Sequence, residues 1–486
     1  MSKEAIKGLE PKLVWEHFYE ITQIPRPSKK EEKIRAWVRE WAKKHGFKYK
    51  EDKAGNFVIS VPATKGYEKS PVVVLQGHLD MVCEKNKGTK HDFENDPIKI
   101  KRENGWITAE GTTLGADNGI GVAAGMAAAL DPKAVHGPLE LLLTVDEETG
   151  MTGVSALKKN FISGKILLNM DSEEDGVFYV GCSGGQDTVG IFDIQWTRAK
   201  SGNQPVEVLV TGLKGGHSGL DIHQGRANAI KLLGYLLNKL EFPFQIAQIT
   251  GGSLRNAIPR EAEAVLLVNP NDINKLRKQV KEFVKNSLLE FGKADPGLEI
   301  KVKKLNDKFS KAFKNDFEKK VIDTIVALPH GVIAMSADIP DLVETSTNLA
   351  TVSMDGKKLT VGTSQRSSIE SAKDNISASV SAIFKLAGAK VSIGDGYPGW
   401  KPNMDSPLLK LSKEVYKKLF KKEPEIKAIH AGLETGLLGS KYPGLDMISF
   451  GPTILGAHSP DEKVNIKDVA KFYDLLKGLL KKLAKK

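Results

Sequence analysis

Three apolar stretches in the first 171 residues of this chain each finish in acidic or histidine side chains. They are VVVLQGHLD, LELLLTVDE and KILLNMD, and a small-residue helical pattern, NGIGVAAGMAAAL, lies between the first two. Apolar strands that alternate with helical patterns are typical of a mostly parallel sheet with both faces covered. We therefore expect an α/β domain with a charged sheet edge. Repulsion among its carboxylates would destabilise that edge unless cations or solvent lie there, and we expect cations.

The pattern changes after residue 187, where strands alternate with long amphipathic helices. The segment NLATVSMDGKKLTVGTS predicts a hairpin that turns at Asp355 and Gly356. Such units favour an α+β domain with an antiparallel sheet of four or more strands. Near residue 398, GYPGW interrupts the pattern, and buried-strand patterns return after it. We predict an α/β domain from residues 1–187 and 398–486, interrupted by an α+β lid or dimerisation domain at 188–397.

The net charge of +11 comes mostly from lysines spread along helical faces and in the C-terminal LLKGLLKKLAKK. Surfaces that bind nucleic acid concentrate basic charge and interleave aromatic residues, but this tail has no aromatic residue. Its apolar stripe at helical spacing favours a packed C-terminal helix over an arm that binds membrane or nucleic acid. No apolar run reaches the about 18 residues of a membrane span. With two cysteines and no secretory signal pattern, we expect a cytoplasmic protein.

Histidine and acidic side chains collect at the expected sheet edge. They are His78, Asp80, Asp117, Glu147, Glu148 and Asp171. Ligands of open α/β sheets bind at the carboxyl ends of the strands. A single Asp at a strand end is more often a helix N-cap or a turn residue, but four such segments together favour a metal site. Imidazole and carboxylate ligands suit two zinc ions, with Co²⁺ or Mn²⁺ as substitutes, whereas calcium would need no histidine.

Several motifs resemble those of the co-catalytic zinc peptidases of the M20 family. These are GHLDMV, GADNGIG, DEETG and NMDSEEDG. With GLKGGHSG, HAGLETG and GAHSPDE, the chain is similar to the aminoacyl-histidine dipeptidase branch (peptidase D, carnosinase-like). Thr435 in HAGLETG is a departure, since this branch is expected to have cysteine there. The resemblance covers essentially the whole chain and implies a catalytic α/β domain interrupted by a lid or dimerisation domain.

The resemblance also implies a set of metal ligands. His78 and Asp171 would bind one zinc ion, Glu148 and His458 would bind the other, and Asp117 would bridge the two. Together with activated water, three ligand carboxylates nearly neutralise two dications, which makes burial of so many acids tolerable.

Asp80 and Glu147 would complete the catalytic group. Asp80 would orient the His78 imidazole and so select its ligating nitrogen. Glu147 would be the general base that takes a proton from the activated water and passes it to the leaving amine. The substrate is then an amide. We expect a dipeptide of the Xaa-His type, such as β-Ala-His, or a broader range of dipeptides.

Four residues are candidates for substrate binding. His217 lies among glycines in GGHSG, where a surface turn residue is the alternative reading, and His430 follows a predicted strand. Arg366 ends the hairpin strand, and its guanidinium suits bidentate capture of the substrate carboxylate, although a solvated strand arginine is common. Asn256 resembles the lid asparagine that approaches the substrate. In dimeric relatives the histidine equivalent to His217 crosses from the partner's lid to stabilise the oxyanion, so we predict a homodimer.

Other functions share this metal core. N-acyl-amino-acid deacylation and carboxypeptidase action would use the same ligands, and only a substrate panel separates them from dipeptide hydrolysis. A metal-binding or peptide-binding protein on a peptidase scaffold would lack enzymatic activity. That alternative predicts the loss of Glu147 or of a ligand, and all of them are present.

Overall fold

The computed structural model describes residues 2–484, which form two compact units. The first unit consists of the residues up to Gly181, Pro402–Ala428 and the residues from Leu433 onward. The inserted unit consists of Cys182–Lys401 and Ile429–Gly432.

The catalytic domain of residues 1–187 and 398–486 and the lid or dimerisation domain of residues 188–397 remain predictions. Residues 1, 485 and 486 of these segments lie outside the described residues.

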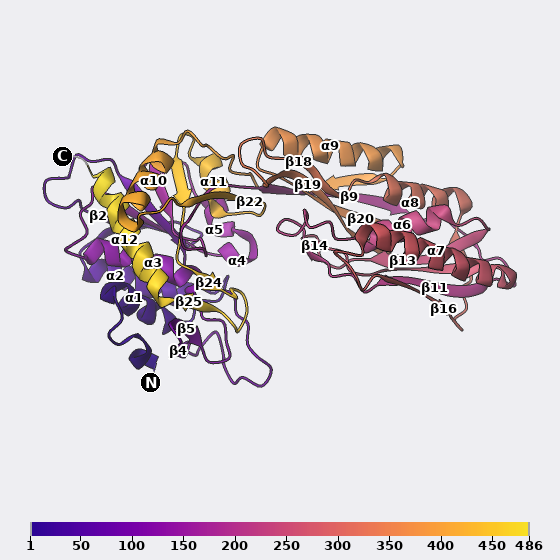
Figure 1. Cartoon of the computed structure of the whole chain (residues 1–486), viewed down its shortest axis with the longest axis horizontal. Coiled ribbons are helices and arrows are strands. Elements are labelled where there is room, and N and C mark those ends of the chain that lie inside the picture. Colours follow the sequence, from indigo (N-terminus) through magenta and orange to yellow (C-terminus); the bar gives the residue numbers. More distant parts are fainter. Residues whose placement is uncertain (1, 485–486) are drawn as a thin grey trace. The chain divides into compact units, whose positions relative to one another are not determined.

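A mixed eight-stranded sheet forms the centre of the first unit (Figure 1). In sheet order its strands are β1 (Lys48–Glu51), β2 (Phe57–Val61), β6 (Leu139–Thr144), β3 (Val73–His78), β7 (Ile166–Asn169), β23 (Asp446–Ser449), β8 (Val177–Cys182) and β22 (Glu425–Ile429). The four strands from β6 to β23 are parallel, whereas β1, β2 and β8 pair in antiparallel fashion. Every residue of β3 and β6 is buried, so both faces of the sheet are covered at its centre.

Helices pack around this sheet. They are η1 (Ser2–Ile6), α1 (Lys12–Thr22), α2 (Glu32–Lys44), α3 (Ala116–Leu130), α4 (Glu147–Gly150), α5 (Thr152–Ala156), α10 (Pro407–Phe420), α11 (Glu434–Lys441) and α12 (Ile466–Leu483). Helix α3 is the predicted small-residue helix and is buried along almost its whole length. Helix α12 buries Val469, Phe472 and Leu476, which confirms the packed C-terminal helix.

A small antiparallel sheet in the first unit joins two distant parts of the chain. In order, its strands are β24 (Ile454–Leu455), β25 (Lys463–Asn465), β5 (Trp106–Ala109) and β4 (Ile100–Glu103). The connection from β24 to β25 carries His458, and the chain passes from β5 to the segment of Asp117. Asp117 and His458 are 341 positions apart in the sequence, yet their side chains meet.

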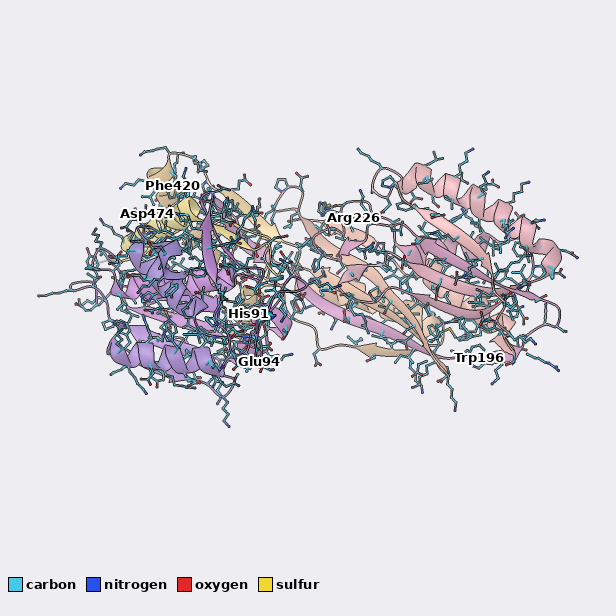
Figure 2. All side chains as sticks on the ribbon, turned by 90° about the horizontal axis from the view of Figure 1, so that it is seen from below. His91, Glu94, Trp196, Arg226, Phe420 and Asp474 are labelled. Atoms are coloured by element: carbon cyan, nitrogen blue, oxygen red, sulfur yellow. The ribbon has the colours of Figure 1, made fainter. Side chains whose placement is uncertain are left out.

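The inserted unit is built on a larger antiparallel sheet. In order, its strands are β16 (Glu299–Lys304), β11 (Gln204–Thr211), β15 (Ala262–Val268), β13 (Phe244–Gly251), β19 (Val343–Asp355), β20 (Lys358–Ser367), β9 (Gly184–Asp193) and β21 (Lys390–Ile393), with β18 (Gly331–Met335) also paired to β19. Two ribbons join β10 (Trp196–Arg198) to β17 (Lys311–Phe313) and β12 (Gly216–His217) to β14 (Ala257–Ile258). In the first ribbon, the ring centroids of Trp196 and Phe313 lie 5.5 Å apart (Figure 2).

Helices run along this sheet (Figure 1), and the α-helices among them share one apolar core with it. They are α6 (Ala229–Lys239), η2 (Pro270–Asp272), α7 (Ile273–Phe291), α8 (Asn315–Ala327) and α9 (Glu370–Leu386). The predicted fold class, an α/β domain with an α+β insertion, is confirmed. Within residues 2–484, no helix combines the length and the apolar character that crossing a bilayer requires.

Strands β19 and β20 form the predicted hairpin, but its turn lies one position later than predicted. Asp355 and Lys358 pair across the ladder, which leaves Gly356 and Lys357 as the two turn residues. Gly356 has a φ of 49°, a conformation that glycine adopts at little steric cost.

Candidate metal centre

Strand β3 delivers His78 to the carboxyl edge of the central sheet. His78 is the last residue of β3 and lies opposite Thr144, the last residue of β6, while β7 pairs with the other side of β3. The residues that follow β6 and β7 therefore emerge beside His78. Nε2 of His78 lies 3.1 Å from Asp117 Oδ1 and 3.3 Å from Asp171 Oδ1. Three predicted ligands thus meet at this edge.

Asp80 connects the His78 imidazole with the turn that follows β6. Nδ1 of His78 lies 3.4 Å from Asp80 Oδ1 and 3.2 Å from the Asp80 carbonyl oxygen. The Asp80 carboxylate accepts hydrogen bonds from the N–H groups of Glu147 and Glu148, at 3.0 and 3.2 Å, and from Ser28 Oγ at 2.8 Å. Burial opposes its ionisation, but the His78 contact and these bonds lower the pKa of Asp80 to about 2. An ionised Asp80 orients the ring.

A second group joins Asp117 to Glu148 and His458. Nε2 of His458 lies 3.0 Å from Glu148 Oε2 and 3.3 Å from Asp117 Oδ2. Asp117 therefore directs Oδ1 toward His78 and Oδ2 toward His458. A carboxylate that bridges two cations requires this arrangement.

The three acids after β6 have different surroundings. Asp146, with a φ of 53°, accepts hydrogen bonds from the hydroxyl groups of Thr149 and Thr152, so its carboxylate stabilises the turn. The side chain of Glu148 is 3% exposed, and its Oε1 has no hydrogen-bond partner within residues 2–484. Ligand atoms of Glu147 and Glu148 lie within 4.8 Å of His78 and of each other. Glu147 and Glu148 thus lie in potential metal-binding groups with His78, whereas Asp146 lies in a separate group with Glu31 and Asp80.

Burial increases the proton affinity of two carboxylates in this cluster. It raises the pKa of Glu147 well above its ordinary value and that of Asp171 to about 7. Hydrogen bonds to carboxylates, first among them Asp117, raise the pKa of His458 to about 11. Burial opposes a charge on His78, but Asp171 and its neighbouring acids outweigh it and raise the pKa of that ring. Divalent cations would displace these protons on binding.

The donor set fits divalent transition-metal cations. Each of three groups brings its ligand atoms within 4.8 Å of one another: His78 with Asp117 and Asp171, His78 with Glu147 and Glu148, and Asp117 with Glu148 and His458. Imidazole nitrogens and carboxylate oxygens suit zinc, cobalt or manganese. The buried Glu148 Oε1 is an acceptor that a cation would satisfy. All five predicted ligands are thus brought together in the first unit.

Sequence reasoning missed Glu434, a fully buried carboxylate behind β3 and β6. Its Oε2 accepts hydrogen bonds from Gln76 Nε2 at 2.6 Å and Thr144 Oγ1 at 2.7 Å. Burial raises the pKa of Glu434 to about 8. The motif HAGLETG contains this residue, but only its contacts show that it supports the two ligand-bearing strands. Thr435, the departure from the resembled motif, is also fully buried.

The predicted substrate-binding residues lie in the inserted unit. His217 pairs with Ala257 between β12 and β14, next to Asn256. The loop of His217 is closed by Asp295, whose carboxylate accepts hydrogen bonds from the N–H groups of Lys214 and Ala227, both at 2.7 Å. Inside this loop, Arg226, which is labelled in Figure 2, carries the guanidinium of an ion pair. Its partner is Asp221, at 3.1 Å. The histidine is therefore presented by an anchored loop.

The protonation state of His217 follows from its contacts. Nδ1 accepts hydrogen bonds from the N–H groups of Gly219 and Leu220, at 3.2 and 3.1 Å, so the ring proton lies on Nε2. Burial and the charge of Arg366 lower the pKa of His217. At neutral pH the ring is neutral and offers Nε2–H as a donor.

Arg366 and His430 meet around Ser346. Arg366 is buried and lies opposite Ser346 in the ladder of β19 and β20, and Ser346 Oγ is 2.7 Å from His430 Nε2. Arg366 Nε donates to Ser218 Oγ at 3.4 Å, and its Nη1 donates to the Tyr397 hydroxyl at 2.9 Å. Burial lowers the pKa of His430 to about 3, so this ring is neutral. His217, Asn256, Arg366 and His430 are therefore connected within one unit.

Tyr397 is a second residue that sequence reasoning missed. Its segment, GYPGW, has the glycine and proline content of an interruption between elements. Its ring fits closely against Gly185 and Gly432, where an added Cβ would come within 2.7 and 2.8 Å of ring atoms. The hydroxyl contact with Arg366 connects the ring to the predicted substrate-binding residues.

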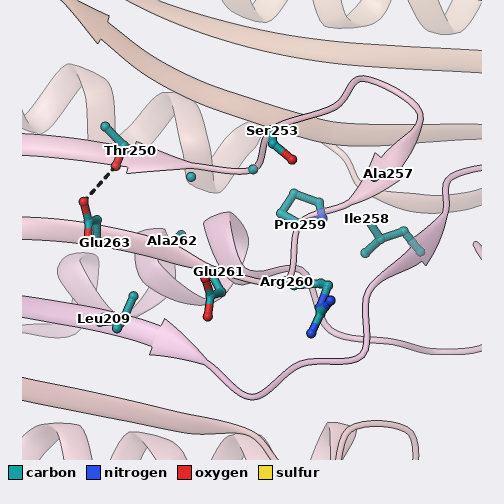
Figure 3. Close-up of a pocket in the computed structure, with 12 residues that line it drawn as sticks. Leu209, Thr250, Ser253, Ala257, Ile258, Pro259, Arg260, Glu261, Ala262 and Glu263 are labelled. Carbon is teal, nitrogen blue, oxygen red and sulfur yellow. Dashed lines mark hydrogen bonds between the residues drawn. The ribbon is translucent and has the colours of Figure 1, made fainter. Parts of the chain in front are cut away.

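In the inserted unit, a cavity of about 560 Å³ is lined in part by Ala257 and Ile258 of β14 (Figure 3). Thr250, Pro259, Arg260 and Glu263 are among its lining residues, and Thr250 Oγ1 donates to Glu263 Oε1 at 3.3 Å. In the described part of the chain, its lining includes none of the predicted site residues. We therefore assign it no part in the chemistry.

Comparisons with known proteins identify the family of this chain. The family described as Peptidase family M20/M25/M40 matches residues 74–482. The chain is 43% identical to the cytosol non-specific dipeptidase of Escherichia coli (strain K12), with 99% of each chain covered. It is 41% identical to the aminoacylhistidine dipeptidase from Vibrio alginolyticus, whose crystal structure matches with a TM-score of 0.91 over 99% of both chains. The aminopeptidase PepT from Bacillus cereus, at 16% identity and a TM-score of 0.57, shares the fold over 98% of this chain and 100% of its own.

Proposed function

This chain belongs to peptidase family M20/M25/M40, and we propose that it hydrolyses dipeptides with two divalent cations and Glu147 as the general base. It is a hydrolase that acts on peptide bonds. One observation carries the proposal: two groups of potential ligands share Asp117, which directs one oxygen to each. Identity above 40% to two dipeptidases over almost the whole chain supports dipeptides as substrates.

The proposed metal ligands divide into two pairs around one bridge. His78 and Asp171 would hold the first cation, Glu148 and His458 would hold the second, and Asp117 would contact both. The 3.3 Å contact of His78 with Asp171 and the 3.0 Å contact of His458 with Glu148 support this division. Zinc is the proposed metal, with Co²⁺ or Mn²⁺ as functional substitutes.

The proposed mechanism gives separate tasks to the two glutamates. When bound, the cations lower the pKa of a water molecule and polarise the scissile carbonyl. Glu147 takes a proton from the attacking water and delivers it to the leaving amine, so its carboxylate must reach both. Asp80 supports this role because it accepts the Glu147 N–H at 3.0 Å and also contacts the His78 ring.

The proposed substrate-binding residues contact the C-terminal carboxylate of the dipeptide and its scissile carbonyl. Arg366 binds the C-terminal carboxylate of the dipeptide through its planar guanidinium. The Nε2–H of His217 stabilises the oxyanion that develops on the scissile carbonyl. Asn256 and His430 complete the group around the substrate. The contacts of Arg366 with Ser218 and of His430 with Ser346 support a shared location.

We further propose a cytoplasmic homodimer in which His217 of the partner subunit completes the active site. The name of the Escherichia coli relative supports the cytoplasmic location and a broad dipeptide range. The name of the Vibrio alginolyticus relative supports Xaa-His dipeptides such as β-Ala-His within that range.

A substrate panel tests the proposed function. Metal-reconstituted protein would be assayed on β-Ala-His, other Xaa-His dipeptides, unrelated dipeptides, longer peptides and acetylated amino acids. We expect hydrolysis of dipeptides and loss of that activity after chelation. Faster cleavage of acetylated amino acids would favour a deacylase, and release of C-terminal residues from longer peptides would favour a carboxypeptidase. Failure to cleave any of these substrates would overturn the proposal.

A further inference from the structure

Glu462 is a buried carboxylate that the proposed mechanism does not use. It is 2% exposed. Its Oε2 accepts hydrogen bonds from the N–H groups of Leu114 and Gly115, at 2.7 and 2.9 Å. Its Oε1 accepts hydrogen bonds from the N–H groups of Ala116 and Asp117, at 2.7 and 3.2 Å. One side chain therefore fixes four consecutive backbone donors.

The four donors belong to the segment that carries the proposed bridging ligand. Gly115 has a φ of 71°, and this left-handed residue turns successive N–H groups toward one anion. Asp117 and Asn118 have non-helical backbone angles, so the four donors form a turn that precedes the regular part of helix α3. Asp117 is the last of the four donors. Glu462 therefore sets the backbone position from which the bridging side chain extends.

Glu462 also belongs to the loop of His458. Its N–H donates to the carbonyl of Ser459 at 3.1 Å, and its own carbonyl accepts a hydrogen bond from Thr108 Oγ1 at 3.0 Å. The loop is thus tied both to itself and to β5. Through its carboxylate, the same residue ties this loop to the Asp117 segment.

Arg26 holds the same segment through a carbonyl. It is buried, and its Nη2 donates to the Gly115 carbonyl oxygen. Its Nη1 donates to the carbonyl oxygens of Leu79 and Asp80, at 2.9 and 2.7 Å. A Cβ at position 115 would overlap Arg26 Nη2, so only glycine fits there. Arg26 therefore links the Asp117 segment to the residues that directly follow His78.

We propose that Glu462 and Arg26 are positioning residues of the dinuclear metal centre, acting through the backbone of residues 114–117. This inference rests on the proposed metal site. Neither residue is a ligand, but together they fix the segments of His78, Asp117 and His458 relative to one another. A preorganised ligand set binds metal more tightly than one that must be ordered on binding.

Glu140 provides a matched control. It is 8% exposed, and its carboxylate accepts hydrogen bonds from the N–H groups of Ser163 and Gly164, at 2.9 and 3.1 Å. It lies on β6 four residues before Thr144, about 13 Å from the ligand edge at 3.3 Å per residue. Loss of this carboxylate should cost stability without changing the metal centre.

The experiment compares Glu462→Gln, Arg26→Lys and Glu140→Gln with the wild-type protein. The amide of Glu462→Gln keeps the side-chain volume but places an NH₂ group against backbone N–H donors. Zn²⁺ dissociation constants would be measured by chelator competition, the ligand geometry by Co²⁺ absorption spectra, and stability by thermal unfolding of each metal-free protein. We expect Zn²⁺ binding weakened by about 10- to 100-fold and shifted Co²⁺ bands in Glu462→Gln and Arg26→Lys. Glu140→Gln should keep the wild-type Zn²⁺ dissociation constant and the wild-type Co²⁺ spectrum.

Each result has a distinct meaning. A Glu462→Gln protein with wild-type Zn²⁺ affinity and Co²⁺ spectrum, destabilised like Glu140→Gln, would make Glu462 a structural cap and overturn the inference. Should Glu462→Gln fail to fold, Arg26→Lys carries the test by the same two readouts. A wild-type protein that binds neither Zn²⁺ nor Co²⁺ would instead overturn the proposed function.

Discussion

The adjacent glutamates after β6 allow a test of the division of roles. Glu147→Gln keeps the side-chain size and the backbone N–H that donates to Asp80 at 3.0 Å, but it removes the proposed proton acceptor. A positioned general acid–base group contributes about 10²- to 10⁴-fold in rate. This factor corresponds to about 3 to 5 kcal/mol of transition-state stabilisation. We expect kcat to fall by that factor while both cations stay bound.

Glu148→Ala removes a different interaction. Oε2 of Glu148 lies 3.0 Å from His458 Nε2, and its buried Oε1 has no hydrogen-bond partner in the described part of the chain. Loss of a hydrogen-bond partner behind a ligand costs about 10- to 100-fold in metal affinity, and loss of a ligand itself should cost more. We expect Glu148→Ala to emerge from gel filtration with less metal than the wild-type protein.

Elemental analysis and initial rates on a dipeptide measure both quantities in each variant. The wild-type protein and Glu147→Gln should contain the same amount of metal, with only the wild-type protein active. Equal metal loss in Glu147→Gln and Glu148→Ala would refute the division of roles. Wild-type turnover by Glu147→Gln would refute its assignment as the base.

Arg366→Ala should reduce kcat/KM far more for dipeptides with a free carboxylate than for their amides, because only the carboxylate offers a bidentate partner. Equal losses of kcat/KM for the dipeptides and their amides would indicate a structural role for Arg366. Mixing inactive His217→Ala and Glu147→Gln proteins under subunit exchange should restore about one quarter to one half of wild-type activity in a symmetric dimer. If dimers that have exchanged subunits stay inactive, His217 acts within its own chain. Burial raises the pKa of Glu318 to about 7 from an ordinary 4.5, so its stabilising contribution is complete below pH 4.5 and is lost as the pH rises through 7. Glu318→Gln mimics the protonated acid and should therefore increase the free energy of unfolding near pH 8 by up to about 3 kcal/mol. The expected readout is a higher Tm at that pH, and an unchanged Tm would contradict the assignment.

The ligand-bearing sheet edge was predictable because its signals are local. Continuous apolar stretches that end at His78, Glu147 and Asp171 specify buried strands, and parallel strands bring their carboxyl ends to one edge. The strand order β6-β3-β7 was not predictable in this way, because it depends on long-range pairing. The meeting of His458 with Asp117 also lacked a local signal. The family resemblance, and not the spacing, pointed to His458.

The missed residues are polar groups whose partners lie far away in the sequence. Periodicity cannot distinguish a buried carboxylate such as Glu434 from a solvated one, because burial depends on which distant segments cover it. The partners of Arg26 are carbonyl oxygens, and no sequence pattern marks an individual carbonyl as available. The hairpin turn was misplaced by one residue because Asp-Gly is a strong turn signal, whereas the pairing of Asp355 with Lys358 decides the turn position.

Charge balance connects the proposed metals with the buried residues behind them. Burial of charge costs several kcal/mol per ion unless opposite charges compensate it. The three proposed ligand carboxylates, Asp80 and Glu462 would bring five negative charges into this region, and Arg26 brings one positive charge. Glu147, which must be ionised to act as the base, would bring a sixth negative charge, so two dications would balance four of the five that remain. Removal of either Arg26 or Glu462 would therefore disturb both the backbone geometry and the charge balance of the centre. Removal of Glu140, which lies four residues before the end of β6, would change neither.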